Sequence, residues 1–331
     1  MKYKLTALAL CALLLLGLFA ACSAAGNTNS TTRPDLEGKK FSVVATIFPA
    51  FDWTRQLIGE NSDHVALTLL LDKGTDLHNY QPTVEDIYKI STADVFVYVG
   101  GESDKWVPDA LAQATNQNMK TVCLLDALGA AAREEEALEG MEDHEEEAED
   151  EGPAYDEHVW LSLRNARTLC AAVCQALQAA DPDCAASYRT NLETYDASLA
   201  ELEDRYAAAM EIAARKTLLF ADRFPFRYLA DDYGLNCYAA FSGCSAETEA
   251  SFETVNFLVS KVDELGLPYI MVLESGDTRL ADTIVENSAA GNARVLQLNS
   301  LQSVTAAGVE EGISYLSVME ENLDVLKTAL N

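Results

Sequence analysis

One uninterrupted helical segment divides this chain of 331 residues into two parts. Residues 185–214 contain no proline or glycine, and large apolar side chains recur there at spacings of three and four. These side chains are Tyr188, Leu192, Tyr195, Leu199, Leu202 and Tyr206. Such periodicity predicts a single long amphipathic helix. The chain is therefore expected to fold as two parts on either side of a rigid connecting helix.

Short apolar runs alternate with helical stretches on both sides of that helix. Before it, the expected strands are 41–47, 65–71, 95–99 and 121–125. After it, they are 217–221, 236–241, 269–273 and 294–298. Strands that alternate with helices predict mostly parallel, helix-covered sheets. We therefore expect an α/β fold in which two parallel-sheet α/β lobes, 39–184 and 215–331, are joined by the 185–214 helix and enclose a ligand cleft.

The first residues predict export and attachment to a membrane. Two lysines precede an apolar run from Leu5 to Leu18, which is shorter than the roughly 20 residues that span a bilayer. Small residues then precede Cys22, which predicts a cleaved signal peptide over residues 1–21 and a lipid on Cys22. Ordinary secretion with an incidental cysteine is the alternative. Residues 22–38 read as a flexible tether. The expected location is the extracytoplasmic face of the cell membrane.

The formal net charge of −30 narrows the possible partners. We do not expect the chain to bind nucleic acid, because the phosphates of nucleic acid bind to lysine and arginine side chains. The negative charge of the chain would instead attract cations. Of the 18 residues 134–151, 12 are Asp or Glu, and self-repulsion predicts an extended, disordered insertion. This insertion could concentrate metal ions near a binding site, act as a low-affinity cation store, or be only a solvated linker.

Six cysteines follow Cys22, and an external location permits disulfides. Cys170 and Cys174 have apolar neighbours on a predicted helix, which favours buried free thiols over a metal pair. Cys237 and Cys244 flank the end of an expected strand and are candidates for a disulfide.

Two of the four histidines stand at positions typical of ligand sites. His78 lies in the loop after the second expected strand, and His158 lies just before a helix. Loops at such positions carry the ligand-binding residues of many α/β folds, and imidazole is a common zinc ligand. His64 and His144 stand elsewhere, and His64 is expected to be a surface residue.

Four motifs in this order resemble the metal-binding lipoproteins of zinc and manganese ABC importers. They are VATIFP at 44–49, GTDLHNYQPT at 74–83, ADVFVYVGG at 93–101 and EHVWLS at 157–162. The resemblance covers nearly the whole mature chain and implies one metal ion in the cleft between the lobes. It also implies that His78 and His158 are the first two ligands and that the partner is an ABC permease. A monomer is expected.

The resemblance fails at the third ligand, where Arg223 stands in place of the family's histidine. Arginine cannot bind a cation because it stays protonated. We therefore nominate the neighbouring Asp222, with an ion pair to Arg223 or Arg227 as its alternative role. Glu274, at the end of a buried strand, is the expected fourth ligand. Reserve candidates are Glu247, Glu249 and, as a soft donor, Cys244.

Two histidines with carboxylates suit zinc, manganese or iron(II), and the resemblance favours zinc with manganese as the alternative. A zinc hydrolase is a competing hypothesis because an open zinc site also supports hydrolysis. The sequence has no His-Glu-x-x-His helix or Gly-x-Ser-x-Gly turn, so we expect a binding protein and not an enzyme. A lipid-anchored adhesin is the remaining alternative.

Overall fold

The structure is a computed structural model, and it describes residues 39–141, 154–245, 249–274 and 277–331. The expected signal peptide, the lipidation site Cys22 and the tether all lie outside the described residues. Among the helices of the described part, none has the length and the apolar character that a membrane crossing requires.

The first lobe is built on a sheet of four parallel strands. Their order is β2 (Val65–Leu69), β1 (Phe41–Ala45), β3 (Val95–Tyr98) and β4 (Lys120–Cys123). All residues of the central strand β1 are buried, as expected for a parallel strand covered on both faces. The helices of this lobe are α2 (Phe48–Ile58), α3 (Val84–Thr92), α4 (Val107–Ala112), α5 (Leu124–Leu128) and α6 (Leu163–Ala180). Helix α2 packs on β1 and β2, whereas α6 packs on β3 and β4.

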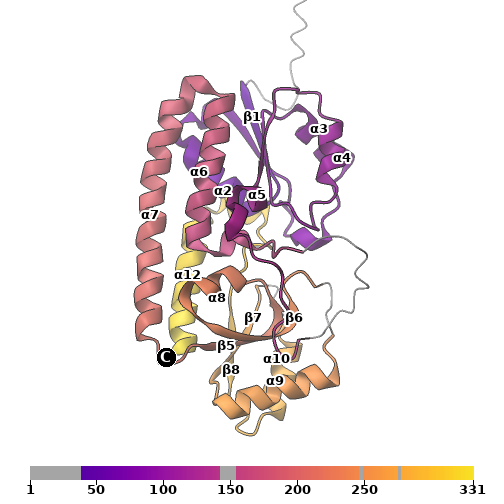
Figure 1. Cartoon of the computed structure of the whole chain (residues 1–331), viewed down its shortest axis with the longest axis vertical. Helices are drawn as coiled ribbons and strands as arrows, with labels where there is room; N and C mark the ends of the chain where they lie inside the picture. Colours follow the sequence, from indigo (N-terminus) through magenta and orange to yellow (C-terminus); the bar gives the residue numbers. More distant parts are fainter. Residues whose placement is uncertain (1–38, 142–153, 246–248, 275–276) are drawn as a thin grey trace, which may run out of the picture. The chain divides into compact units, whose positions relative to one another are not determined.

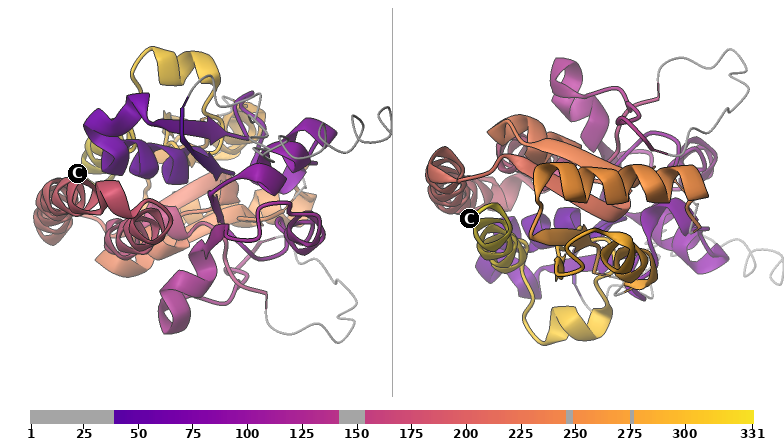
Figure 2. Two further views of the ribbon diagram at one scale, coloured as in Figure 1. Left: turned by 90° about the horizontal axis from the view of Figure 1, so that it is seen from above. Right: turned by 90° about the horizontal axis from the view of Figure 1, so that it is seen from below.

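The second lobe repeats this plan. Its parallel strands lie in the order β6 (Asn236–Ser242), β5 (Thr217–Phe224), β7 (Tyr269–Val272) and β8 (Arg294–Gln297). Its helices are α8 (Arg227–Tyr233), α9 (Phe252–Leu265), α10 (Arg279–Asn287), α11 (Ala306–Glu310) and α12 (Tyr315–Leu330). Helix α9 contacts β5 and β6, and α10 contacts β5, β7 and β8 (Figure 2). Two parallel-sheet α/β lobes are therefore present, and the predicted fold class is confirmed.

Helix α7 (Ala185–Ile212) connects the two lobes. It contacts α2 and α6 of the first lobe and α8 and α12 of the second, and Figure 1 shows it running beside α6 and then beside α12. The helix ends two residues before the expected boundary because Ala213 has an extended ψ of 132°. The C-terminal helix α12 also contacts α2, so it forms a second link between the lobes that the sequence analysis did not anticipate.

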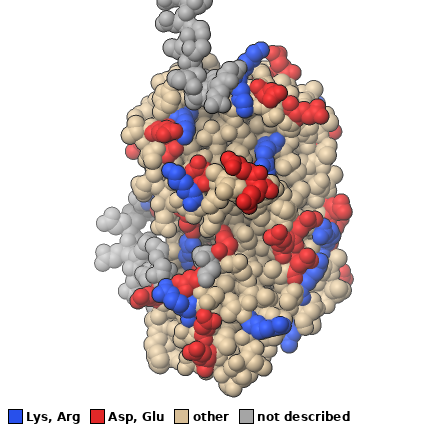
Figure 3. Space-filling view, turned by 180° about the vertical axis from the view of Figure 1, so that it is seen from behind, with Lys and Arg blue, Asp and Glu red and all other residues tan. Residues whose placement is uncertain are grey.

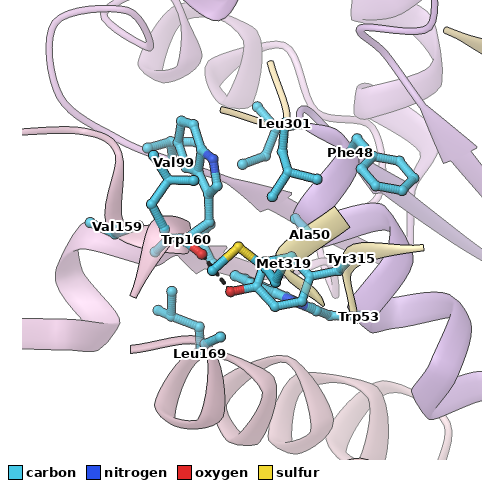
Figure 4. Packing of buried hydrophobic residues seen from close by; sticks show 14 of the residues in the cluster. Phe48, Ala50, Trp53, Val99, Val159, Trp160, Leu169, Leu301, Tyr315 and Met319 are labelled. Carbon is cyan, nitrogen blue, oxygen red and sulfur yellow. Dashed lines mark hydrogen bonds between the residues drawn. The ribbon is translucent and has the colours of Figure 1, made fainter. Parts of the chain in front are cut away.

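A continuous hydrophobic core joins the lobes beneath these helices. The Tyr315 hydroxyl donates to the Trp160 carbonyl at 2.6 Å, and the Tyr315 ring meets Trp53 edge-on at 5.3 Å between ring centroids (Figure 4). The Trp160 indole N–H donates to the carbonyl of Ser300 at 2.9 Å. Because Trp160 immediately follows the 157–159 segment, this core fixes the backbone that carries His158.

The six cysteines of the described part are free thiols. Cys170 and Cys174 are buried, as predicted. The candidate disulfide between Cys237 and Cys244 is not formed, because extended strand β6 separates the two residues. Seven residues of strand at about 3.3 Å each place their Cα atoms much farther apart than the roughly 6 Å that a disulfide allows.

The first residues of the acidic insertion 134–151 are ordered, in contrast to the expected disorder. Glu135 pairs through its backbone N–H with the carbonyl of Ala154 at 2.8 Å, and Met141 is buried. The Arg227 guanidinium binds the carboxylate of Glu136 at 2.6 Å, so charge repulsion is locally offset. Residues 134–141 therefore have a defined path, whereas 142–151, with His144, lie outside the described residues.

The acidic excess is not gathered into one patch on the face that Figure 3 shows. There, Asp and Glu side chains are interspersed with Lys and Arg. In the described part of the chain, several arginines form ion pairs with carboxylates, such as Arg205 with Glu320 at 2.6 Å and Arg167 with Asp196 at 2.7 Å. Exposed pairs of this kind each contribute about 0–1 kcal/mol, so stability depends mainly on the shared core.

The Tyr315 hydroxyl offers a test of that shared core. Tyr315→Phe would leave the buried Trp160 carbonyl without its partner, which should lower the free energy of unfolding by about 1–3 kcal/mol. Denaturant unfolding followed by tryptophan fluorescence measures this loss. Tyr88→Phe, at a side chain that is 45% exposed, is the matched control. Equal stability of the two variants would contradict a role for this bond.

Candidate metal centre

His78 is held in place by its own loop. Residues Leu77–Asn79 form a single turn of 3-10 helix, which Asp76 caps by accepting the His78 backbone N–H at 3.0 Å. Leu77 is buried and anchors the turn, whereas the His78 side chain is 7% exposed. Because the backbone is fixed on both sides, the imidazole has little freedom to turn away.

His158 is fully buried and is oriented by a carboxylate. Asp156 Oδ1 accepts both the backbone N–H of His158 at 2.9 Å and its ring Nδ1 at 2.9 Å. A carboxylate can only accept, so we assign the ring proton to Nδ1. The other ring nitrogen, Nε2, then presents a lone pair. A histidine whose far nitrogen donates to a carboxylate is the usual arrangement of a metal ligand.

The two imidazoles face each other through these lone pairs. His78 Nε2 lies 3.1 Å from His158 Nε2. His78 Nδ1 is 2.7 Å from the Ser103 hydroxyl and 3.5 Å from Glu157 Oε2, which suits a proton on Nδ1. Two nitrogen ligands at about 2.0 Å from a tetrahedral zinc ion lie about 3.3 Å apart, so this spacing accommodates a metal ion with little movement.

The surroundings favour a neutral His78. Burial, reinforced by the neighbouring His158, lowers the pKa of His78 to about 3. At neutral pH the ring therefore carries no second proton that a metal ion would have to displace. Histidine must be neutral to bind a metal, so burial prepares this side chain as a ligand.

Cys244 supplies a third donor from the second lobe. Its Sγ, His78 and His158 offer ligand atoms that all lie within 4.8 Å of one another. Gly243 permits this approach, because a Cβ at that position would lie 2.8 Å from His158 Cε1. Burial raises the pKa of the Cys244 thiol, and the carboxylates of Glu135 and Glu157 raise it further. Metal binding there would release the thiol proton.

Glu157 forms a buried carboxylate behind the two imidazoles. One oxygen accepts the Ser103 backbone N–H at 2.8 Å, and the other has no hydrogen-bond partner. Burial raises the pKa of Glu157 to about 7. The side chain also fills the space beside Gly101, where a Cβ would lie 2.4 Å from its Oε1. Glu157 therefore fixes Ser103, and through it His78, and once deprotonated it would place negative charge next to a cation held by the two imidazoles.

The nominated ligand Asp222 lies outside this donor group. It sits at an irregularity of β5, where the pairing with β6 shifts register. One carboxylate oxygen accepts the Leu273 backbone N–H at 3.0 Å, and the other accepts the Arg223 backbone N–H at 2.8 Å. Its contacts are those of a residue that ties β5 to the end of β7.

Arg223 spans the lobes where the family's third ligand is expected. Its guanidinium binds the Asp76 carboxylate at 2.6 Å, and Asp76 in turn caps the turn that carries His78. A cavity of 560 Å³ opens beside this ion pair, lined by Asn79 of the first lobe and by second-lobe residues that include Asp222 and Arg223. Through Asn79, this cavity adjoins the turn that carries His78.

Glu274 is also placed outside the donor group. Its carboxylate accepts the backbone N–H of Ser300 at 2.8 Å, the Ser300 hydroxyl at 2.8 Å, and the N–H groups of Gln302 and Ser303. These contacts hold the 300–303 turn in place. The carbonyl of Ser300, at the start of this turn, accepts the indole N–H of Trp160. Of the reserve candidates, Glu249 is exposed and Glu247 lies outside the described residues.

The sequence contained one signal for Cys244, the thiol that lies beside the two histidines. Cys244 follows Gly243 directly after an expected strand, and a soft donor next to a flexible residue at a strand end is a plausible ligand position. Sequence patterns alone could not rank Cys244 above Asp222, because the approach of Gly243 to His158 is a contact between the lobes.

The whole chain resembles known proteins. The family model described as "Zinc-uptake complex component A periplasmic" (ZnuA) matches residues 43–329. The zinc-binding lipoprotein AdcA of Streptococcus pneumoniae (strain ATCC BAA-255 / R6) is 33% identical over 98% of this chain and 60% of its own length. The high-affinity zinc uptake system protein ZnuA of Bacillus subtilis (strain 168) is 29% identical over 95% of this chain and 97% of its own length.

A solved structure agrees with these matches. The Zn(II)-bound ZnuA-like domain of Streptococcus pneumoniae AdcA is 30% identical, with a TM-score of 0.68 over 88% of this chain and 99% of that domain. The chain spans 56–60% of the length of the AdcA proteins it matches. The match to the family model covers both lobes and the helix between them. The chain therefore belongs to the ZnuA family, described as the periplasmic component A of zinc-uptake complexes.

Proposed function

We propose that this protein captures a zinc ion between its lobes with His78, His158 and Cys244 and delivers it to the permease of an ABC importer. The observation that carries the proposal is the pair of buried imidazoles whose Nε2 atoms face each other at 3.1 Å. Two lone pairs at this distance repel each other unless a proton or a cation lies between them. A cation is favoured when both rings carry their proton on Nδ1, as the contact of Asp156 with His158 and the Ser103 and Glu157 oxygens near His78 Nδ1 support.

The donor set supports zinc over manganese as the cargo. Manganese prefers carboxylate, carbonyl and water ligands, whereas thiolate and imidazole suit zinc. Cys244 supplies a soft donor, while the carboxylates of Asp222 and Glu274 are engaged by backbone N–H groups. The relatives named above are zinc-binding or zinc-uptake proteins, in agreement with this assignment.

Capture and release would depend on loops and not on large movements of the lobes. The two histidines belong to the first lobe and Cys244 to the second, so a bound ion would link the lobes directly. The shared core and the two helices α7 and α12 oppose a wide opening. Arg223 places a positive charge next to the site, which weakens cation binding and so favours release.

Lipid attachment at Cys22 remains part of the proposal, because that residue lies outside the described part of the chain. The S. pneumoniae relative is named a lipoprotein, which supports it. The acidic residues 134–151 are proposed to raise the local metal concentration. A hydrolase is the competing reading, since three protein ligands leave one position open on zinc, and hydrolytic turnover by the loaded protein would favour it.

Removal of either imidazole tests the site. His78→Ala or His158→Ala should weaken zinc binding by more than about 100-fold, because even outer-shell partners of a metal ligand contribute about 10–100-fold. Competition with a chromophoric zinc chelator, starting from the metal-free protein, measures the change. Cys237→Ser, which changes a residue outside the metal-binding groups, is the control and should keep the affinity of the intact chain. Unchanged affinity in both alanine variants would rule out this site.

A second comparison separates Cys244 from the nominated carboxylates. Cys244→Ser should weaken zinc binding at least about tenfold and abolish the thiolate-to-cobalt charge-transfer band of this site. Asp222→Asn and Glu274→Gln should retain the band, because those side chains serve backbone N–H groups. The measurement is cobalt(II) absorption at one equivalent, with Cys237→Ser as control. Loss of binding in Asp222→Asn with retention in Cys244→Ser would restore the carboxylate assignment.

A further inference from the structure

A second group of mixed metal-binding side chains lies at the other end of helix α6. His64, Asp181 and Cys184 offer ligand atoms that all lie within 4.8 Å of one another. His158 stands before the first residue of α6, whereas Asp181 directly follows its last. The 18 residues of this helix extend about 27 Å at 1.5 Å per residue, so the two groups are separate sites.

Three segments of the first lobe bring these side chains together. His64 ends the 3-10 turn Gly59–Asp63 just before β2, and its carbonyl accepts the backbone N–H of Phe41 at 3.3 Å. Asp181 ends α6, and Cys184 lies in the short turn Pro182–Cys184 that leads into α7. The backbone of all three residues is therefore fixed by secondary structure.

The Asp181 carboxylate is the centre of the group. It is 7% exposed, and its Oδ2 lies 3.1 Å from His64 Nε2 and accepts the buried Tyr188 hydroxyl at 2.7 Å. Tyr188 thus orients the carboxylate from behind, as an outer-shell partner orients a metal ligand. The 3.1 Å between Nε2 and Oδ2 is close to the roughly 3.3 Å that separates two ligands of a tetrahedral zinc ion.

Solvent can reach this group without any rearrangement. The His64 side chain is 30% exposed and Cys184 is half-buried, whereas the carboxylate between them is buried. The thiol is free. A plain ion pair would need only the histidine and the aspartate. The additional thiol within reach of both supplies a soft donor, and one imidazole, one carboxylate and one thiolate together suit zinc.

We propose that His64, Asp181 and Cys184 form a second, solvent-accessible site for a divalent transition-metal ion of the zinc class. A water molecule would complete its coordination. The bound ion would link the turn between α6 and α7 to His64, just before the start of β2. It would do so independently of the cleft site, because the two groups share no residue.

Cobalt(II) titration of the reduced, metal-free full chain tests this proposal. Thiolate ligands give cobalt a near-ultraviolet charge-transfer band, which carboxylates of the acidic segment do not. We expect two equivalents with thiolate bands in the intact chain, one in Cys184→Ser, one in Cys244→Ser, and none in the double variant. Cys237→Ser, which changes a cysteine outside both groups, should retain both equivalents.

His64→Gln is an independent variant that keeps a hydrogen-bond donor for Asp181 but lacks the imidazole. It should weaken the second equivalent at least about tenfold and leave the first unchanged. A second thiolate equivalent that persists in Cys184→Ser or in His64→Gln would overturn the proposal, as would its absence from the intact chain. If the intact chain binds only one equivalent of cobalt with a thiolate band, and that band is lost in Cys184→Ser but kept in Cys244→Ser, the proposed function would be contradicted and this second site would stand.

Discussion

The packing of Trp160 and Tyr315 at the junction of the lobes is the interaction on which the rest of the structure depends. Trp160 follows His158 by two residues, and its carbonyl and indole N–H are both bound by groups of the second half of the chain. The backbone that carries His158, a proposed metal ligand, is therefore fixed by residues from the C-terminal helix and the turn after β8. A common core makes the site a property of both lobes together.

In the proposed site, the two histidines come from the first lobe and the thiol from the second. His78 and His158 are each held by an aspartate two residues earlier, through the same backbone contact from the histidine N–H to the aspartate side chain. Cys244 instead lies in a turn after β6, directly after Gly243. Uptake and release would then concern this turn, while the histidine pair stays prepared for the next ion.

Local patterns in the sequence predicted the two sheets, the connecting helix and both histidines, because strand, helix and motif signals are properties of short segments. Local patterns do not show which second-lobe side chain lies beside the two histidines. Asp222 and Glu274 stand at strand ends where carboxylates often bind metals, yet both are engaged by backbone N–H groups from distant segments. The approach of Gly243 to His158, which brings Cys244 to the site, depends on the relative placement of the lobes.

Zinc X-ray absorption spectroscopy tests the central claim most directly. The sample would be the Cys184→Ser chain loaded with one equivalent of zinc, so that the only thiolate expected at the metal is that of Cys244. The account predicts a first shell with nitrogen or oxygen at about 2.0 Å and one sulfur at about 2.3 Å, with the outer-shell scattering of two imidazoles. A shell of nitrogen and oxygen alone, without sulfur, would contradict it.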